Sequence, residues 1–275
     1  MPQRAALAYM GTQFNSIEVN GSFYGLLRPE TYRAWYDQTP PGFVFAVKGS
    51  RFITHNKKLL DVETPLANFF ASGVLLLREK LGPMVWQLPA TARFDAERLD
   101  AFFRLLPNDT RAAARLARRH DHRVAGRCWT RAIVSAPLRH AIEVRSERFF
   151  VSAFFDLARR HGVAVVISDA AGWPRIEEPT ADFVYARLHG AERTYSSGYD
   201  DRGLDAWATR FDCWRRGREP HDAVRITPKR AARRGGRDVY VYFDNDFEAN
   251  APHDALRLAT RLPAVPPPNG GAGLS

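Results

Sequence analysis

The sequence predicts an α/β fold of the (β/α)8 TIM-barrel type, and two observations lead to this prediction. First, segments with strand-like alternation are separated by helical patterns, and no hairpin signal joins neighbouring strands, which indicates a parallel sheet. Second, each predicted strand carries a polar residue near its C-terminal end. A doubly wound sheet would concentrate such residues at one switch point, whereas a barrel collects them from every strand at one face.

The segment 183–190 shows this pattern most clearly. Its apolar face consists of Val184, Ala186 and Leu188. The opposite face carries Tyr185, Arg187 and His189, and successive side chains of a strand point to opposite faces. One face is therefore expected to pack, while the other offers ionisable groups to a pocket at the C-terminal face of the barrel.

Seven strands are expected. They span residues 14–20, 43–50, 84–88, 140–145, 164–169, 183–190 and 238–246. Helices are expected around them, at residues 4–13, 29–36, 66–81, 95–106, 110–119, 146–161, 204–214 and 251–262. Three residues fit helix ends: Pro29 in a first turn, Asp95 as an N-cap and Gly162 as a C-terminal cap. The prediction is one domain over residues 1–262, followed by a disordered Pro- and Gly-rich tail at 263–275.

Length and composition narrow the class of protein. A chain of 275 residues with 45% hydrophobic residues can bury the core of one large α/β domain. No apolar run approaches the ~20 residues of a membrane span, and the N-terminus has no signal-peptide core. The two cysteines, Cys128 and Cys213, form neither a disulfide framework nor a metal-type spacing. We therefore expect a cytoplasmic protein without a membrane partner.

The net charge of +10 suggests anionic partners. Much of the excess lies in two segments, Arg111–Arg139 and Arg215–Arg237, either of which is a candidate nucleic-acid surface. Both connect a helix to the next strand, so in a barrel they lie on the face away from the pocket. The alternative is an ordinary solvated surface, because 35 arginines against 5 lysines also fit a compositional bias.

Several motifs resemble those of one known family. They are Ile17-Glu18-Val19-Asn20 with Phe23-Tyr24, Phe45-Ala46-Val47-Lys48 with Thr54-His55, Gln87-Leu88-Pro89, Glu143-Val144-Arg145, residues 185–190, and Tyr242-Phe243-Asp244-Asn245-Asp246. In this order and over about residues 5–262, the chain resembles the YecE-like family, also named domain of unknown function 72. The resemblance implies a TIM barrel and no particular activity, since the family's function is not established.

One departure from the family pattern concerns the beginning of the chain. Members usually carry a further Gly- and Trp-containing strand ahead of the helix that leads to the Glu18 strand. This sequence starts after that strand, so the expectation is a barrel that lacks its first strand because the N-terminus is truncated. An open seam beside the strands of Glu18 and Tyr242 would expose backbone edges.

Acidic and basic residues are expected to converge at the strand ends. The acids are Glu18, Glu143, Asp169 and Asp246, and the bases are Lys48, Arg145, Arg187 and His189. The structural alternative is a buried polar network that satisfies itself, because charges in a barrel mouth must be paired. Eight ionisable positions at one end of a barrel are hard to explain by structure alone.

Three kinds of chemistry fit this set. A divalent metal is not favoured, and no ligand is assigned, although magnesium or manganese would fit better than zinc. A glycosidase-like pair would use Glu18 and Glu143. A site for a small anion ranks first, because Lys48, Arg145 and Arg187 offer groups suited to phosphate or carboxylate. Lys48 could form a Schiff base only if desolvation lowers its pKa.

The resulting prediction is an enzyme, hydrolytic, lyase-like or isomerising, for a small anionic or hydroxylated substrate. Glu143, His189 and Glu18 would supply acid–base groups, oriented by Asp169 and Asp246, while Lys48, Arg145 and Arg187 would bind the substrate. Further candidates for substrate contact are Asn20, Tyr24, His55, Gln87, Tyr185, Tyr242 and Asn245. The alternative is a non-catalytic protein that binds a small anion, or nucleic acid through the basic segments. No cofactor is identified.

Overall fold

The structure, a computed structural model, describes residues 3–173, 175–190, 198–232, 235–245 and 249–263. Its strands are β1 (Ser16–Val19), β2 (Val44–Lys48), β3 (Leu81–Gln87), β4 (His140–Glu143), β5 (Ala164–Val165), β6 (Ile167–Asp169), β7 (Phe183–Leu188) and β8 (Asp238–Phe243). The α-helices are α1 (Gln3–Gln13), α2 (Gly21–Tyr24), α3 (Pro29–Gln38), α4 (Glu63–Ala71), α5 (Ala96–Leu105), α6 (Thr110–Ala117), α7 (Ser152–His161), α8 (Asp201–Arg215) and α9 (Asn250–Ala259). A π-helix, η1 (Phe52–Asn56), and three 3-10 helices, η2 (Val74–Lys80), η3 (His122–Val124) and η4 (Glu147–Phe149), complete the described elements.

The strands form two parallel sheets, as the absence of hairpin signals predicted. One sheet has the order β1-β2-β3-β4-β5 and the other β6-β7-β8. The sheets meet inside the predicted strand 164–169, which divides at Val166, whose amide donates to the Ile142 carbonyl at 2.9 Å. All seven predicted strands are therefore present, the fifth in two pieces. Among the described residues β1 and β8 share no backbone pairing, so the predicted closed barrel is not seen.

Side chains nevertheless connect the two edge strands. The inner faces of strands from both sheets share one small apolar cluster, which includes Ala46, Val85, Ala141 and Tyr185. Tyr242 on β8 stacks near Tyr185 with ring centroids 5.2 Å apart, and its phenol oxygen accepts a hydrogen bond of 3.0 Å from the Ser16 hydroxyl on β1. The strands thus curve around a common interior.

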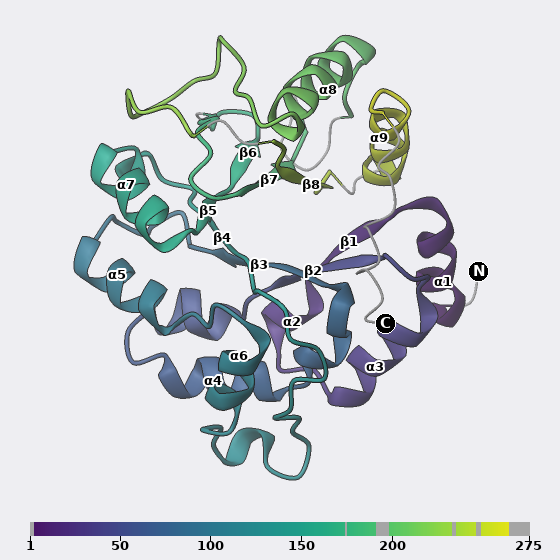
Figure 1. Cartoon of the computed structure of the whole chain (residues 1–275), viewed down its shortest axis with the longest axis vertical. Helices are drawn as coiled ribbons and strands as arrows, with labels where there is room; N and C mark the ends of the chain where they lie inside the picture. The colour runs from purple at the N-terminus through teal and green to yellow at the C-terminus, as the bar shows by residue number, and fades with distance from the viewer. Residues whose placement is uncertain (1–2, 174, 191–197, 233–234, 246–248, 264–275) are drawn as a thin grey trace.

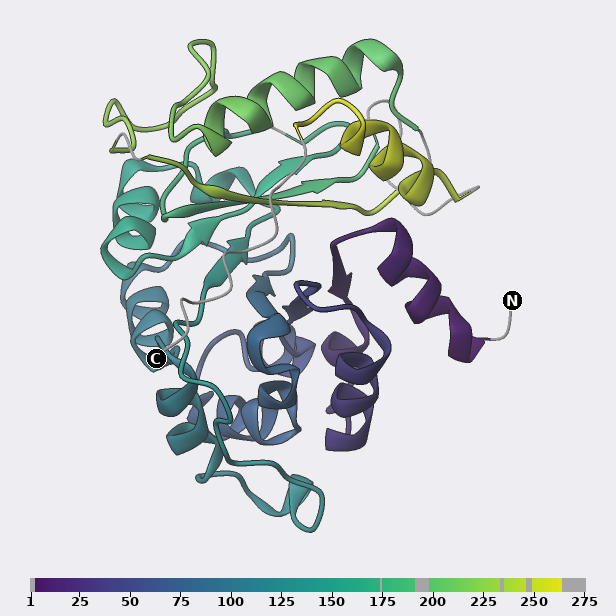
Figure 2. The same cartoon turned by 45° about the vertical axis from the view of Figure 1, so that its right-hand side comes forward.

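Helices cover the outer side of the strands. Helices α3 to α7 lie along the outside of β1–β5, while α8 and α9 lie over β6–β8 (Figure 1, Figure 2). The apolar face predicted for the strand 183–190 is confirmed, because Val184, Ala186 and Leu188 share a core cluster with Leu204 and Trp207 of α8. Within the part of the chain that the structure describes, no helix has both the length and the apolar character to span a bilayer.

The predicted helix 66–81 is wrong in its extent. The chain forms α4, breaks at Gly73, and continues as the 3-10 helix η2. Gly73 has a φ of 114°, and a Cβ there would lie 2.6 Å from Pro29 Cα, so only glycine fits. The largely apolar run from Leu66 to Leu77 hid this boundary, because it gives no period that distinguishes one long helix from two elements. Gly82 and Pro83, which follow directly after the predicted helix, lie inside β3.

The end of β2 is fixed by a close approach. Directly after Lys48, a Cβ on Gly49 would lie 2.2 Å from the Trp86 ring, so the chain passes this ring only as glycine. The Gly49 amide donates to the Val85 carbonyl at 2.9 Å, and the Ser22 hydroxyl donates to the Lys48 carbonyl at 2.6 Å. The backbone of Lys48 is therefore held from both neighbouring elements.

Candidate functional site

Arg187, near the C-terminal end of β7, is the centre of a buried charge network. Its side chain is 1% exposed, and its NH1 group donates to Glu143 Oε2 at 2.8 Å. Its NH2 group donates to Glu18 Oε1 at 3.0 Å and to Asp244 Oδ2 at 2.9 Å. Three carboxylates from β1, β4 and the end of β8 thus share one guanidinium. We call Arg187, Glu18, Glu143, Asp244, His189 and Arg145 the Arg187 network.

His189 lies between two of these carboxylates. Its Nδ1 is 3.1 Å from Asp244 Oδ2, and its Nε2 is 3.5 Å from Glu143 Oε1. The backbone amide of His189 donates to the Asp169 carbonyl at 2.8 Å. This hydrogen bond fixes the backbone from which the imidazole projects, just after β7. An imidazole with a carboxylate at each nitrogen is oriented from both sides, as an acid–base group requires.

The rim of the network is cationic and aromatic. Arg145 contacts Glu143 Oε1 through Nε and NH2, both at 3.1 Å, and its guanidinium lies 4.8 Å from the Trp173 ring centroid. The Trp173 ring is 5.4 Å from that of His189. Lys48 Nζ lies 4.5 Å from the Phe23 ring centroid. Arg145 and Asp244 are the most accessible charged members, with side chains 15% and 23% exposed.

Opposite charges decide the protonation of the network. Burial raises the pKa of Glu143, but Arg187, His189 and Arg145 outweigh it and lower the pKa below its usual range. Burial also raises the pKa of Asp244. The hydrogen bond with His189 and the charge of Arg187 outweigh this effect, so the pKa is lowered. For His189, burial is outweighed by the hydrogen bonds that its ring donates to Asp244 and Glu143, which raise its pKa. These interactions therefore favour the ionised carboxylates and the protonated imidazole over their neutral forms.

The network contains several of the predicted site residues, but Arg187 does not have the substrate-binding position that was predicted for it. Glu18, Glu143, Arg145, Arg187 and His189 are brought together as predicted. Tyr185 joins them, since its hydroxyl donates to Glu18 Oε2 at 2.6 Å. Arg187 is enclosed by carboxylates rather than open to a substrate, so we assign it to holding these acids in place.

Asp169 and Asn245 point away from the network, against the prediction. Asp169 Oδ2 accepts hydrogen bonds from the Tyr199 hydroxyl at 2.9 Å and from Trp207 Nε1 at 3.0 Å, on the α8 side. Asn245 Nδ2 donates to Asp254 of α9 at 3.0 Å. The prediction that Asp169 faces the interior is wrong. A strand that is buried on both faces shows no alternation, so the sequence does not indicate which of the residues 164–169 face inward.

The remaining candidates lie around the rim or outside the described residues. Asn20 precedes α2, and Tyr24 is exposed on its surface. His55 packs edge-on against Phe23, with ring centroids 5.2 Å apart. Gln87 is buried, aligned with Glu143 in the β3–β4 register, while Tyr242 lies deeper, beside Tyr185. Asp246 falls outside the residues that the structure describes, as does the tail from 264.

Sequence reasoning missed Asp244 and Ser168. Asp244 lies two residues beyond the inward Tyr242, so the alternation of β8 could have identified it. Ser168 follows the inward residues Ala164 and Val166 at the same spacing. Its hydroxyl is buried and has no hydrogen-bond partner within the described parts of the chain. It lines a cavity of about 140 Å³ together with Arg145, Ser146 and Trp173.

The described residues include no group of three or more His, Cys, Asp or Glu side chains arranged to hold a metal ion. The carboxylates of the Arg187 network turn toward a guanidinium instead of toward one shared point. The chemistry of this donor set therefore fits an internal cation better than a metal.

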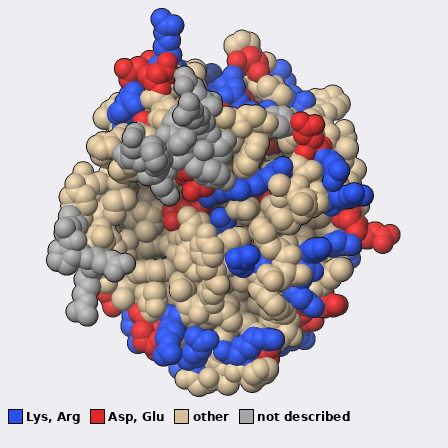
Figure 3. All heavy atoms as spheres, turned by 180° about the vertical axis from the view of Figure 1, so that it is seen from behind, with Lys and Arg blue, Asp and Glu red and all other residues tan. Residues whose placement is uncertain are grey.

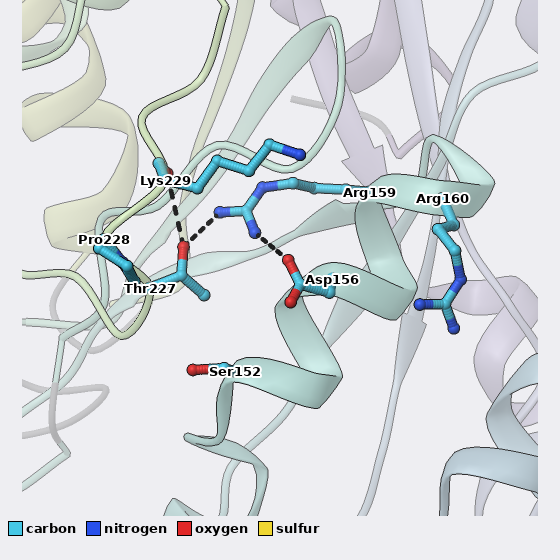
Figure 4. Close-up of a pocket in the computed structure, with 7 residues that line it drawn as sticks. All are labelled: Ser152, Asp156, Arg159, Arg160, Thr227, Pro228 and Lys229. Atoms are coloured by element: carbon cyan, nitrogen blue, oxygen red, sulfur yellow. Dashed lines mark hydrogen bonds and ion pairs between the residues drawn. The ribbon is translucent and has the colours of Figure 1, made fainter.

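A larger hollow of about 560 Å³ lies away from the strand ends, between α7 and residues 227–229 (Figure 4). Arg159 lies at its centre and is held by Asp156 at 3.0 Å and by the Thr227 hydroxyl at 2.9 Å. Glu178 pairs with the same guanidinium. Because both terminal nitrogens of its central guanidinium are already paired, we place the candidate site at the smaller cavity beside Arg145.

The two basic segments contain many paired arginines. Arg123 pairs with Asp121 at 2.7 Å and Arg216 with Asp212 at 2.6 Å, within the same segments or close to them. Arg139 reaches Asp238, the first residue of β8, at 2.5 Å, which joins the ends of the two segments. On the face drawn in Figure 3, basic groups alternate with acidic and uncharged atoms rather than forming one stripe. Nucleic-acid binding stays a prediction.

Comparisons with known proteins agree with the resemblance seen in the sequence. A family model described as "Protein of unknown function DUF72" matches residues 1–270. A DUF72 family protein from Thermotoga maritima has a similar structure, with 19% identity, a TM-score of 0.69, and coverage of 94% of this chain and 90% of that one. Another from Enterococcus faecalis has 15% identity, a TM-score of 0.66 and coverage of 94% of both chains.

These structural matches are too distant in sequence to show more than a shared fold. No curated protein matches the chain. The match to the family model covers nearly the whole sequence, and the motifs around Glu18, Lys48, Glu143 and Arg187 are those that carried the resemblance. The chain therefore belongs to the DUF72 family of proteins of unknown function.

Proposed function

We propose that the protein is an enzyme that acts on a small anionic or hydroxylated substrate by acid–base chemistry at the C-terminal strand ends. The observation that carries the proposal is His189, held between Asp244 and Glu143 beside the accessible guanidinium of Arg145. Groups whose surroundings push their pKa values apart are typical of acid–base sites.

The charges of the site favour an anion. Three carboxylates, those of Glu18, Glu143 and Asp244, are opposed by Arg187, Arg145, Lys48 and His189. Arginine keeps its charge at any physiological pH, and Arg145 lies at the partly exposed edge, where a carboxylate or phosphate would pair with it. Arg145 offers this charge at the cavity beside Ser168 and Trp173.

Within this proposal, His189 is the proton donor. Its raised pKa favours the protonated form, and Asp244 provides the partly exposed side through which a proton returns from solvent. A glycosidase-like pair is less suitable, because Arg187 binds both Glu18 and Glu143, and a lowered pKa makes Glu143 a poor general acid.

We also propose that the two sheets are parts of one TIM-barrel-like domain over residues 1–262, open between β8 and β1. The apolar cluster shared by inner faces of both sheets supports this arrangement, as does the Ser16–Tyr242 hydrogen bond across the opening. Cys128 and Cys213 are free thiols, which suits a reducing compartment such as the cytoplasm.

Thermal-shift measurements with inorganic phosphate and with carboxylated and phosphorylated metabolites test the function, with and without magnesium or manganese. We expect anions to raise the Tm of the wild type and not that of Arg145→Met. Arg160→Met, which removes a cation from the hollow beside α7, should respond like the wild type. Equal shifts in wild type and Arg145→Met, or a loss of the shift in Arg160→Met alone, would contradict the proposal.

Binding without turnover is the remaining alternative at the same site. A substrate found in the thermal-shift screen separates the two, because His189→Gln should abolish turnover while anion binding at Arg145 persists. Binding that requires His189 with no turnover in the wild type would favour the binding protein.

A further inference from the structure

Two buried lysines of this chain have different surroundings. Lys80 Nζ donates to the carbonyls of Tyr36 at 2.6 Å and Thr39 at 2.7 Å, and to the Thr39 hydroxyl at 3.2 Å, so all three of its donors are satisfied. Lys48 is 8% exposed, yet its Nζ makes no hydrogen bond or ion pair with any described residue. A buried ammonium is ordinarily paired.

The partners that Lys48 lacks are occupied elsewhere in the network. Arg187 binds all three nearby carboxylates, two of which also contact His189. Lys48 instead faces the ring of Phe23, while its own backbone is fixed by Ser22 and by the close passage of Gly49 past Trp86. The amine is thus positioned and largely buried without a direct ion pair, while Glu18, Glu143 and Asp244 favour its protonated form only from a distance.

The consequence is a more nucleophilic amine. Burial and then the charge of Arg187 lower the pKa of Lys48, which increases the neutral fraction.

We propose that Lys48 forms a Schiff base with a small carbonyl compound that carries a carboxylate or phosphate, and that Arg145 holds this anionic group. The inference rests on the proposed acid–base site and assigns its substrate class. The step is balanced without an oxidant or reductant. The Nζ lone pair attacks the carbonyl carbon, and the carbinolamine oxygen then leaves as water after taking two protons, one from the attacking nitrogen and one from His189, giving the protonated imine.

Residues near Lys48 and Arg145 can stabilise the imine and the anionic group of the substrate. The Phe23 ring face favours the cationic imine in the same way as it favours the ammonium. The unpartnered Ser168 hydroxyl lines the cavity beside Arg145 and can donate to a bound carboxylate or phosphate oxygen. Together these groups accept both ends of a short 2-oxo acid or phosphorylated ketone.

Reductive trapping tests the proposal on the intact protein. Pyruvate, dihydroxyacetone phosphate and uncharged butanone would be added separately with cyanoborohydride, and the modified residue identified by proteolysis and mass spectrometry. With the first two, we expect labelling of Lys48 to exceed that of exposed Lys58 and Lys229 by about tenfold or more, the gain in neutral amine for each unit by which a pKa falls. Lys80 should carry no label.

Two variants provide the controls. Lys48→Arg keeps the charge and should lose the adduct, with circular dichroism to confirm folding. Arg145→Met should reduce labelling by pyruvate and dihydroxyacetone phosphate but not by butanone. Labelling spread evenly over Lys48, Lys58 and Lys229, or none at Lys48, would overturn the Schiff base. If phosphate still raises the Tm only in proteins that retain Arg145, the proposed anion site stands without it.

Discussion

The Arg187 network and a second buried network around Glu178 both pair a buried glutamate with an arginine, but they differ in how their outer groups are satisfied. Glu178 Oε2 accepts from the amides of Ile226 and Thr227 at 2.8 and 2.9 Å. Its Oε1 pairs with Arg159 and the Thr227 hydroxyl. We call these residues the Glu178 network. Both oxygens of Glu178 are occupied, although Arg159 Nε lacks a partner among the described residues, and the result is the attachment of one segment to α7.

The Arg187 network has the same closed centre but an open rim. Asp244 and Arg145 are partly exposed, Lys48 has no anionic partner within 4.0 Å among the described residues, and the Ser168 hydroxyl faces a cavity. Buried charge by itself therefore does not indicate a site. Unsatisfied groups at the edge of a satisfied centre are what distinguish a network that can act on a ligand from one that only holds the fold.

Removing the centre of the Arg187 network should have the largest effect. Arg187→Met leaves the buried carboxylates of Glu18 and Glu143 and the partly exposed Asp244 without their shared cation, and we expect a loss of about 3–5 kcal/mol in the free energy of unfolding. Urea denaturation at neutral pH measures it, and the loss should shrink at acidic pH as the carboxylates protonate. A loss of about 1 kcal/mol or less, the size of an exposed ion pair, would contradict a buried hub.

Changing the centre of the Glu178 network should cost less and act locally. Glu178→Gln keeps one acceptor oxygen but places an NH2 group among donors, at a cost of about 1–3 kcal/mol. Hydrogen exchange at the Ile226 and Thr227 amides should accelerate, while anion binding at the strand ends stays unchanged. Loss of anion binding in this variant would mean that the two networks are coupled.

The pH dependence of stability separates the members of the Arg187 network. Glu143 and Asp244 have lowered pKa values, so their contribution is present above the usual carboxyl range and is lost as pH falls through their folded values. His189 has a raised pKa, so its contribution is present below ~6.5 and is lost as pH rises through the folded value, by up to about 1.4 kcal/mol per pH unit.

The variant His189→Gln separates the contribution of His189 to the loss of stability at alkaline pH from that of the carboxylates at acidic pH. Its urea unfolding should lack the decrease in stability that the wild type shows above neutral pH, whereas the acidic decrease remains. A wild type whose stability is flat above pH ~6.5, the ordinary histidine pKa, would show that His189 is not held protonated.

The smallest change in stability is expected at Lys48. Lys48→Met removes a desolvated ammonium without a partner and should alter the free energy of unfolding by about 0.5 kcal/mol or less. Lys80→Met strips three acceptors of their donor and should cost about 1–3 kcal/mol. Equal losses in the free energy of unfolding would contradict the view that Lys48 lacks partners while Lys80 is fully hydrogen-bonded.

The parallel strands and most strand-end residues could be predicted from local patterns. Alternation in the strand 183–190 correctly separated the face of Arg187 and His189 from the face against α8. It failed for 164–169, where both faces are apolar, so Asp169 was chosen and Ser168 missed. The break at Gly73 depends on contact with Pro29, a residue far away in sequence, and no local signal could give it.

The distribution of partners could not be predicted at all. Sequence patterns placed Arg187 among the substrate-binding residues because arginine suits anions, but three carboxylates from separate strands take up its donors. The same competition leaves Lys48 unpaired. Such an outcome depends on side-chain distances across the inner face, which alternation along one strand does not contain.

The hydrogen bonds between side chains of the two sheets also bear on the order of folding. Ser16 and Tyr242 are 226 positions apart, and Glu18 and Arg187 are 169 positions apart. Closing loops of this length costs chain entropy that only a largely formed structure can offset, so these contacts should form late. The proposed acid–base groups would then meet only after nearly the whole chain has folded. A partly folded or nascent chain would carry all the residues of the site and none of its reactivity.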